Sequence, residues 1–244
     1  VSGAPDTGPP LPNAGSTARA LTRVAESEAA ATANAARATA ENVETVANAI
    51  RVQRTITAPS AAGRTVSTMG DAVSGNTIAA TQGGTVKGAD ICVSGCAIGG
   101  LTQTEQQLVT RIRNGEDSAT GNLTEQLLTS VSQRTGMTVL TGGKYGSNNG
   151  FDLVLQDAAG NVTVIMDAKQ ITQAGSIKLS TKSELGTQLS PEWIQNVVNK
   201  LPLSSPARTA VERAVRNGAL TVAVGGVNRT TGQLIVAPVT VPNK

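Results

Sequence analysis

The 244-residue sequence contains no histidine. Without an imidazole, the chain can form no Ser-His-Asp triad, no Cys-His pair and no histidine-based zinc site. Ribonuclease mechanisms that use two imidazoles for acid–base catalysis are excluded as well. Any hydrolytic activity must therefore rest on carboxylates, lysine, a thiol or a metal ion, and hard divalent cations prefer carboxylate and carbonyl oxygen ligands.

Cysteine and long apolar runs are also scarce. Cys92 and Cys96 are the two cysteines, and two thiols without histidine cannot complete a four-ligand zinc site. A local disulfide in an oxidising compartment and two idle thiols are the alternatives. No run of about 18 apolar residues occurs, so no transmembrane helix is predicted. The chain begins at Val1 without a recognisable signal peptide, which we interpret as the start of a fragment of a longer protein.

Aromatic residues are nearly missing, and all three of them lie in the second half of the chain: Tyr145, Phe151 and Trp193. Residues 1–119 are instead rich in Ala, Gly, Ser and Thr, which offer few large side chains for a core. We therefore predict a partly helical linker or delivery region over residues 1–119 and a folded domain over residues 120–244.

Charge is distributed unevenly between these two parts. Residues 1–119 contain nine Lys or Arg and ten Asp or Glu, a net charge of −1. Residues 120–244 contain eleven and seven, a net charge of +4. A basic domain fits a polyanionic partner such as nucleic acid, although an ordinary solvated surface explains the same balance.

The apolar spacing from residue 101 onward predicts an α/β fold. Helices are expected over residues 105–113, 122–133, 190–201 and 206–217, and strands over residues 137–140, 151–156, 162–168, 220–225 and 233–239. Gly136 is expected to end the second helix, and Ser190 to cap the third. This order of elements predicts a mixed five-stranded sheet flanked by helices.

Residues at the ends of two neighbouring predicted strands suggest a catalytic site. Asp152 lies at the start of one strand, and Asp167 and Lys169 lie at the end of the next. A hairpin of this length brings Asp152 and Asp167 to one end of the sheet. Residues two apart in a strand face the same side, so Asp167 and Lys169 share a face while the Ala168 carbonyl stays available.

These groups have the chemistry of a divalent-metal site. Two carboxylates and a carbonyl can hold Mg²⁺, with Mn²⁺ or Zn²⁺ as alternatives, and leave coordination positions open for water. Such a metal ion lowers the pKa of its water and neutralises phosphate charge, while Lys169 can orient the attacking water or stabilise developing charge. Hydrolysis of a phosphodiester needs these parts and no histidine.

The pattern of Asp152 followed by Asp167-Ala-Lys169 resembles the PD-(D/E)XK signature of the restriction-endonuclease-like superfamily. The likeness covers roughly residues 120–240 and implies that family's core fold and a metal-dependent endonuclease activity. The proline that gives the motif its first letter is absent, and Phe151 stands in its place.

The same resemblance implies two further site residues. An acid from the preceding helix completes the site in this family, and Glu125 is the acid on the helix predicted over residues 122–133. It would then be a metal ligand and a catalytic residue. Gln170 matches the polar residue that often follows the lysine and is assigned to the catalytic set.

Two stretches, residues 146–152 and residues 186–194, are similar to C-terminal toxin domains of contact-dependent growth inhibition and related polymorphic toxin systems. The similarity implies a toxin nuclease carried by a secreted or cell-surface bacterial protein and acting in the cytoplasm of a target bacterium. The analogy slightly favours tRNA over DNA as the substrate, and therefore a tRNase over a DNase. No residue in the sequence decides between the two substrates. It also implies a cognate immunity protein, and it indicates no oligomeric state.

Polar residues around the motif are candidates for substrate binding. They are Lys144, Tyr145, Lys178, Ser180, Thr181, Lys182 and Gln188. Contacts to backbone phosphates suit such groups, and a solvated loop is the alternative for the four residues from 178 to 182. Trp193 is interpreted as a core residue rather than a platform for base stacking.

A different class of function is a non-catalytic binding or adhesin module. The Ala- and Gly-rich first half suits such a role, and Asp152 and Lys169 would then form a structural ion pair. Metal binding near Asp152 and Asp167 would distinguish the metal-dependent nuclease from the non-catalytic binding module.

Overall fold

The computed structural model describes residues 65–87, 96–117, 121–167, 176–181 and 183–243, with only the backbone described for Cys96 and Asp167. All of these residues belong to one compact unit that extends from Val43 to Lys244. Residues 1–64 of the predicted linker or delivery region, and the side chains of both cysteines, lie outside the described residues.

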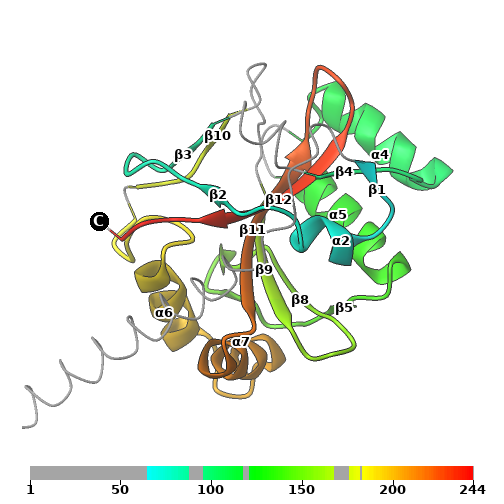
Figure 1. Cartoon of the computed structure of the whole chain (residues 1–244). Coiled ribbons are helices and arrows are strands. Elements are labelled where there is room, and N and C mark those ends of the chain that lie inside the picture. The colour runs from blue at the N-terminus through cyan, green and yellow to red at the C-terminus, as the bar shows by residue number, and fades with distance from the viewer. Residues whose placement is uncertain (1–64, 88–95, 118–120, 168–175, 182, 244) are drawn as a thin grey trace, which may run out of the picture. The chain divides into compact units, whose positions relative to one another are not determined.

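A mixed sheet of eight strands forms the centre of this unit (Figure 1). Its strands are β1 (Thr65–Val66), β2 (Ile78–Ala79), β4 (Cys96–Ile98), β5 (Thr138–Val139), β8 (Leu153–Gln156), β9 (Val162–Asp167), β11 (Leu220–Val227) and β12 (Leu234–Thr240). The order is β1-β4-β12-β11-β9-β8-β5, and β2 also pairs with β12. β11 runs parallel to β9 and antiparallel to β12, while β8 and β9 form an antiparallel hairpin.

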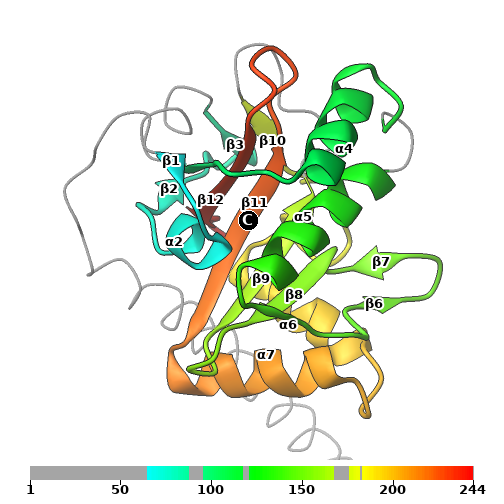
Figure 2. The same cartoon turned by 90° about the vertical axis from the view of Figure 1, so that its right-hand side faces the viewer.

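Helices pack on both faces of the sheet. They are α2 (Met69–Val73), α4 (Gln103–Arg113), α5 (Asn122–Arg134), α6 (Pro191–Lys200) and α7 (Pro206–Asn217). Figure 2 shows α4 and α5 together on one side and α7 on another. Alternate residues of β9 enter different cores: Val164 packs with α6 and α7, and Ile165 packs with α2, α4 and α5. Because β9 is covered on both faces, its sequence is a nearly continuous run of apolar residues.

Local capping sets the ends of several helices. The Ser190 hydroxyl accepts a hydrogen bond from the Trp193 amide, so the predicted cap of α6 is confirmed. α5 ends one residue before Thr135, and Gly136 follows with a φ of 88°, as expected for a terminating glycine. Trp193 is 5% exposed, which confirms that it belongs to the core.

The start of α5 is held by a residue from outside the helix. Its cap position is Gly121, which has no side chain to accept a hydrogen bond. Asp117, only 1% exposed, takes this role: its carboxylate accepts from the Leu123 and Thr124 amides at 2.7 and 2.9 Å. The carboxylate also lies where it complements the positive end of the helix dipole.

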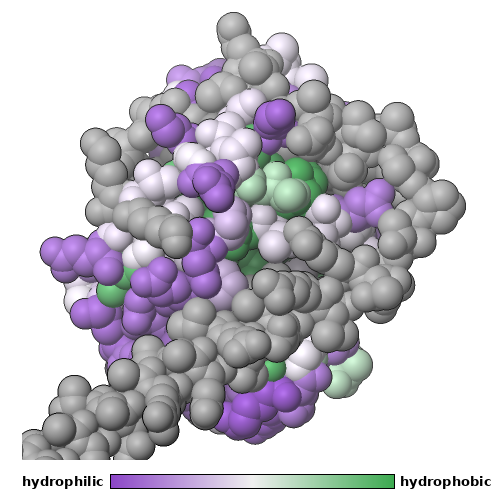
Figure 3. Space-filling view, turned by 60° about the vertical axis from the view of Figure 1, so that its left-hand side comes forward, coloured by the Kyte–Doolittle hydropathy of each residue, from purple (hydrophilic) through white to green (hydrophobic). Residues whose placement is uncertain are grey.

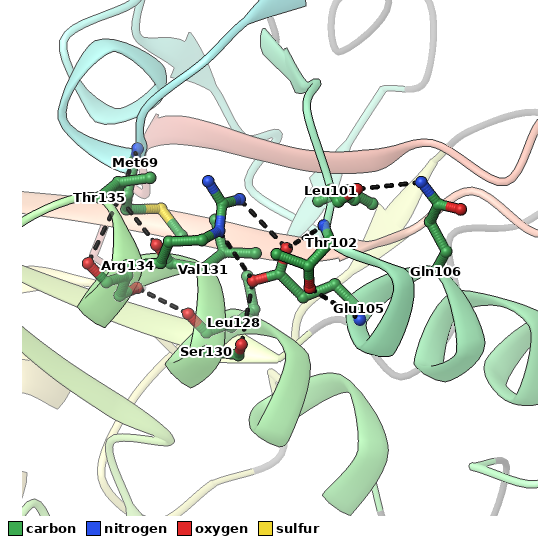
Figure 4. A network of polar contacts seen from close by, with 11 residues as sticks. Met69, Leu101, Thr102, Glu105, Gln106, Leu128, Ser130, Val131, Arg134 and Thr135 are labelled. Carbon is green, nitrogen blue, oxygen red and sulfur yellow. Dashed lines mark hydrogen bonds and ion pairs between the residues drawn. The ribbon is translucent and has the colours of Figure 1, made fainter.

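A buried acidic network joins α4 to α5 (Figure 4). Glu105 is fully buried and accepts hydrogen bonds from the Thr102 amide, from Ser130 and from both Nε and Nη2 of Arg134. Burial raises the pKa of the Glu105 carboxyl, but the hydrogen bonds from Arg134, Thr102 and Ser130 outweigh it and lower that pKa below the usual 4.5. The carboxylate therefore stays charged inside the protein and ties the two helices together.

Two small two-stranded antiparallel sheets accompany the main one. β6 (Lys144–Tyr145) pairs with β7 (Asn149–Gly150), and β3 (Thr85–Val86) pairs with β10 (Ile177–Lys178). Neither was expected, since a strand of two residues is too short to show an alternating pattern.

The mixed α/β class is confirmed, but the main sheet is larger than the five strands expected. The additional strands β1, β2 and β4 come from residues 65–98, so the sheet continues across the expected boundary between residues 119 and 120. These strands have two or three residues each and few large apolar groups. Backbone pairing of β2 and β4 with β12, and of β1 with β4, rather than a hydrophobic pattern of their own, accounts for their formation.

Among the described residues, Leu203 is the one large hydrophobic residue that is strongly exposed, at 82%. Between the grey residues, Figure 3 shows mainly hydrophilic and intermediate residues, with small hydrophobic areas among them. Within the part of the chain that the structure describes, no helix combines the length and the apolar character needed to cross a membrane.

Candidate active site

The β8–β9 hairpin brings Asp152 and Asp167 to the same end of the sheet. Leu153 pairs with Ile165 in this antiparallel hairpin. Asp152 directly precedes Leu153, and Asp167 is the last residue of β9, two residues beyond Ile165. The backbone arrangement is the one expected from the spacing of the two aspartates.

Helix α5 supplies a third acidic residue to this region. Glu125 lies in the first turn of α5, where its amide donates to the Gly121 carbonyl at 3.0 Å. Leu127, Leu128 and Val131 bury one side of α5 against the sheet. Glu125 is only partly buried, and its side chain lies at the border between that packed side and solvent.

Lys144 connects Glu125 with Asp152. Its Nζ donates to Oε2 of Glu125 at 2.6 Å and lies 3.7 Å from Oδ1 of Asp152. The three side chains come from α5, from β6 and from the residue before β8, and Figure 2 shows the β6–β7 hairpin beside α5. We call Glu125, Lys144 and Asp152 the carboxylate–lysine cluster.

The carboxylate–lysine cluster is partly open to water. The side chains of Glu125, Lys144 and Asp152 are 32%, 24% and 18% exposed. Charged groups at this depth retain some hydration, so a ligand can reach them without unfolding of the surrounding structure. The cluster carries two negative charges and one positive charge.

Two glycines shape the hairpin that presents Lys144. Gly143 accepts a hydrogen bond from the Phe151 amide at 2.9 Å, and Gly150, with a φ of 121°, pairs with Lys144. The ring of Phe151 in turn packs edge-on against Trp193, with the ring centroids 5.6 Å apart. The residue before Asp152 is therefore anchored in the core, which holds Asp152 near the lysine.

The remaining residues of the motif lie beyond β9. Ala168, Lys169 and Gln170 are outside the described residues, as is the side chain of Asp167. Among the residues that the structure describes, no group of three or more His, Cys, Asp or Glu side chains is placed to hold a metal ion. The described part of the site therefore comprises the carboxylate–lysine cluster and the backbone position of Asp167.

The chemistry of these donors nevertheless suits a hard cation. Glu125 and Asp152 offer carboxylate oxygens, and an ammonium group already lies within ion-pair distance of both. Carboxylate donors of this kind suit Mg²⁺ or Mn²⁺ better than softer metals.

Other predicted substrate residues have separate positions. Tyr145 follows Lys144 on β6, and Nζ of Lys200 lies 5.9 Å from the centre of its ring. Ser180 and Gln188 contact each other: the Ser180 amide donates to Oε1 of Gln188 at 3.2 Å. Their backbones are joined as well, by a 2.9 Å hydrogen bond from the Gln188 amide to the Ser180 carbonyl.

Two more of the predicted substrate residues, Lys178 and Thr181, lie in β10 or shortly after it in the sequence. Lys178 is exposed at the end of β10, and Thr181 is half-buried. Lys182 lies outside the described residues. The role of these residues in binding substrate stays a prediction.

The pairing of Lys144 with two carboxylates was missed by sequence reasoning, which treated Lys144 only as a possible substrate contact. Lys144 is 19 residues from Glu125 and eight from Asp152, and no periodic pattern links positions on a helix, a hairpin and a strand start. Gly143 and Gly150, which flank the hairpin, were the available signal. Glycines in that arrangement indicate a close approach of two backbone segments, but they do not predict which side chains meet there.

Comparison with protein-family models, with curated proteins and with solved structures finds no match for this chain. The interpretation of the site consequently depends on its residues and their geometry.

Proposed function

We propose that this protein is a metal-dependent endonuclease that hydrolyses phosphodiester bonds in nucleic acid. The observation that carries the proposal is the convergence of Glu125 and Asp152 on one cation, at the end of the sheet where β9 finishes with Asp167. Carboxylates from a helix and from two adjacent strands form a suitable set of oxygen donors for Mg²⁺ or Mn²⁺.

Each residue has a defined role in this proposal. Asp152, Asp167 and the Ala168 carbonyl hold the metal ion, and Glu125 supports it. When bound, the metal ion supplies a water of lowered pKa and neutralises phosphate charge. Lys169 orients the attacking water and Gln170 completes the catalytic set. Tyr145 and the basic residues near β10 contact the backbone of the substrate.

The order of elements supports a restriction-endonuclease-like core. α5 precedes the strands β5, β8 and β9, and α6, α7 and β11 follow them. The positions of Asp152 and Asp167 in that order are those that the resemblance implies for the metal site. Fold order alone does not establish an activity, so the proposal depends on the chemistry of the site.

We further propose that the nuclease is a toxin of bacterial competition, with tRNA slightly favoured over DNA. This part depends on the similarity of residues 146–152 and 186–194 to such toxins. A toxin nuclease must be inhibited in the cell that produces it, which requires a cognate immunity protein. Residues 120–244 carry a net charge of +4, so an acidic face on that inhibitor would be complementary.

A cleavage assay tests the activity directly. The purified full chain is incubated with total tRNA and, separately, with supercoiled plasmid, in the presence of Mg²⁺, Mn²⁺ or Zn²⁺. We expect cleavage of one polymer with at least one metal, and loss of cleavage when EDTA is added. Absence of cleavage of both polymers with every metal would refute the proposed nuclease and favour a binding module.

A further inference from the structure

Hydrogen bonds hold the loop between β11 and β12, residues 228–233, in one shape. The Asn228 amide donates to the Gln233 carbonyl at 2.9 Å, and the Gly232 amide donates to the Asn228 carbonyl at 2.7 Å. Oδ1 of Asn228 also accepts from the Thr230 amide at 2.9 Å. An asparagine that binds nearby amides in this way stabilises a turn, so the loop presents its side chains from a fixed backbone.

Arg113, in the last turn of α4, fastens this loop to the helix (Figure 2). Its Nε donates to the Arg229 carbonyl at 3.1 Å, and its Nη2 donates to the Thr230 carbonyl at 3.5 Å. A Cβ atom at position 232 would lie 3.2 Å from both Cδ and Nη1 of Arg113, so Gly232 leaves the room that this side chain needs. Carbonyl oxygens satisfy the donors of Arg113, but they do not neutralise its positive charge.

The guanidinium of Arg229 has no partner within the described part of the chain. Its Nη2 atom is buried and has no hydrogen-bond acceptor. The ion pairs of the described residues include neither Arg229 nor Arg113. A buried donor without an acceptor is unfavourable, and two positive charges on one loop repel each other. An anion bound at this loop would relieve both effects.

The same loop lies at the end of the sheet where β9 finishes. β11 runs parallel to β9, and Gly225 pairs with Asp167, the last residue of β9. β11 continues for two residues to Val227, and the loop follows. Arg229 is therefore four residues beyond Gly225, at most about 13 Å along the strand direction. An extended ligand at the end of β9 can span this distance.

We propose that Arg229 binds a backbone phosphate of nucleic acid, on a loop that Arg113 holds in place. The inference rests on the proposed nuclease function for the identity of the ligand and adds a substrate contact to it. A guanidinium donates two parallel hydrogen bonds to phosphate oxygens, which suits it to this ligand. Among the described residues no hydrogen bond restrains the Arg229 side chain, so its rotation toward a phosphate breaks none.

Binding measured without cleavage tests the proposal. Fluorescein-labelled tRNA and a labelled DNA duplex are titrated with the full chain in EDTA, and anisotropy is followed from about 50 to about 200 mM KCl. We expect Arg229→Gln to raise the Kd of the more tightly bound nucleic acid roughly tenfold. The slope of log affinity against log salt should fall in magnitude by about 1, as for the loss of one phosphate contact. Arg229→Lys keeps the charge and should keep most of the wild-type slope.

Arg216→Gln is the matched control, because it removes one exposed arginine from the other end of the sheet. Arg216 lies in the last turn of α7, shortly before Leu220, which begins β11 and pairs with Val162 at the start of β9. That end is separated from the end of β9 by more than a Debye length at about 0.1 M salt. The Arg216 variant should therefore bind within about twofold of the wild type. An equal loss in both variants would indicate a general charge effect and overturn the proposal.

The remaining outcomes separate this inference from the nuclease activity. Unchanged binding by Arg229→Gln overturns the inference, as does a wild type that binds neither nucleic acid. Labelled polyglutamate is a third probe, and an equal loss of its binding in Arg229→Gln would indicate an acidic protein partner instead. Circular dichroism checks folding; if neither Arg229→Gln nor Arg229→Lys folds, Arg229 is a structural residue and the inference is refuted. A wild type that cleaves nucleic acid while Arg229→Gln binds it normally refutes only this inference. A wild type that shows the Arg229-dependent binding without cleavage with any metal refutes only the nuclease activity.

Discussion

Gly150 lies so close to Gly143 that a Cβ atom at position 150 would overlap the Gly143 carbonyl oxygen. The same Cβ atom would lie 3.2 Å from the Cα atom of Lys144. Since the opposing atoms belong to the backbone, a side-chain rotation cannot relieve the overlap. This contact between two glycines sets the path of the chain between Lys144 and Asp152.

Gly150→Ala should therefore disturb the site more than an ordinary glycine substitution. Gly160 is the matched control, because it also has a positive φ, 88°, but a Cβ atom there meets nothing within 4 Å. We expect Gly160→Ala to reduce the free energy of unfolding by about 1 kcal/mol, from backbone strain alone. Gly150→Ala should cost about 2 kcal/mol or more and lower cleavage at least about tenfold. Thermal unfolding and the cleavage assay measure both effects, and equal behaviour of the two variants would contradict this prediction.

Substitutions of the proposed catalytic residues should reduce cleavage without destabilising the fold. We expect Asp152→Ala, Asp167→Ala and Lys169→Ala each to reduce cleavage by at least about 100-fold, because each removes a proposed metal ligand or the group proposed to lie beside the attacking water. Circular dichroism should show an unchanged fold. Glu184→Ala, at an exposed carboxylate, serves as the control and should cleave at the wild-type rate. Wild-type activity in the Asp167 variant would remove the proposed site.

Glu105 should contribute to stability rather than to catalysis. Glu105→Gln removes the charge that holds Arg134 and should reduce the free energy of unfolding by about 2 kcal/mol. Glu116→Gln is the matched control, since the ion pair of Glu116 with Arg111 is half-exposed and should contribute less than about 1 kcal/mol. Urea unfolding at pH 7 measures both variants, and a larger loss at Glu116 than at Glu105 would be inconsistent with the buried network.

The lowered pKa of Glu105 predicts how this contribution depends on pH. A carboxyl whose pKa is lower in the folded than in the unfolded state stabilises the fold fully above the unfolded pKa. That stabilisation is lost as the pH falls from about the usual value of 4.5 through the folded pKa. The difference in unfolding free energy between wild type and Glu105→Gln should stay constant from pH 7 to about pH 5 and shrink below pH 4.5. If the difference in unfolding free energy between the two proteins grew as the pH fell below 4.5, the pKa of Glu105 could not be lowered in the folded state.

Local sequence patterns determined the long elements of this protein. The four predicted helices are present as α4 to α7, and their ends follow side chains that are near in sequence, such as Ser190. Asp157 accepts hydrogen bonds from the Ala159 and Asn161 amides in the predicted turn between β8 and β9. These contacts span two to four residues, so the sequence contains enough information to place them.

The placement of Asp152 and Asp167 at one sheet end also follows from the sequence. A hairpin with a short turn leaves little freedom in register, because slipping by one residue would turn the buried side chains of β8 and β9 to the opposite faces. The apolar run of β9 is compatible only with burial on both faces.

The tertiary structure alone decided the contacts between distant segments. Glu125, Lys144 and Asp152 meet because α5 packs on β8 and because the β6–β7 hairpin bends beside both. In the same way, β4 joins the sheet through backbone pairing with β12, more than 130 residues later in the sequence. The physical reason is the same in each case. A backbone hydrogen bond or an ion pair between distant segments leaves no periodic pattern in the sequence, so the packing of the whole chain selects the partners.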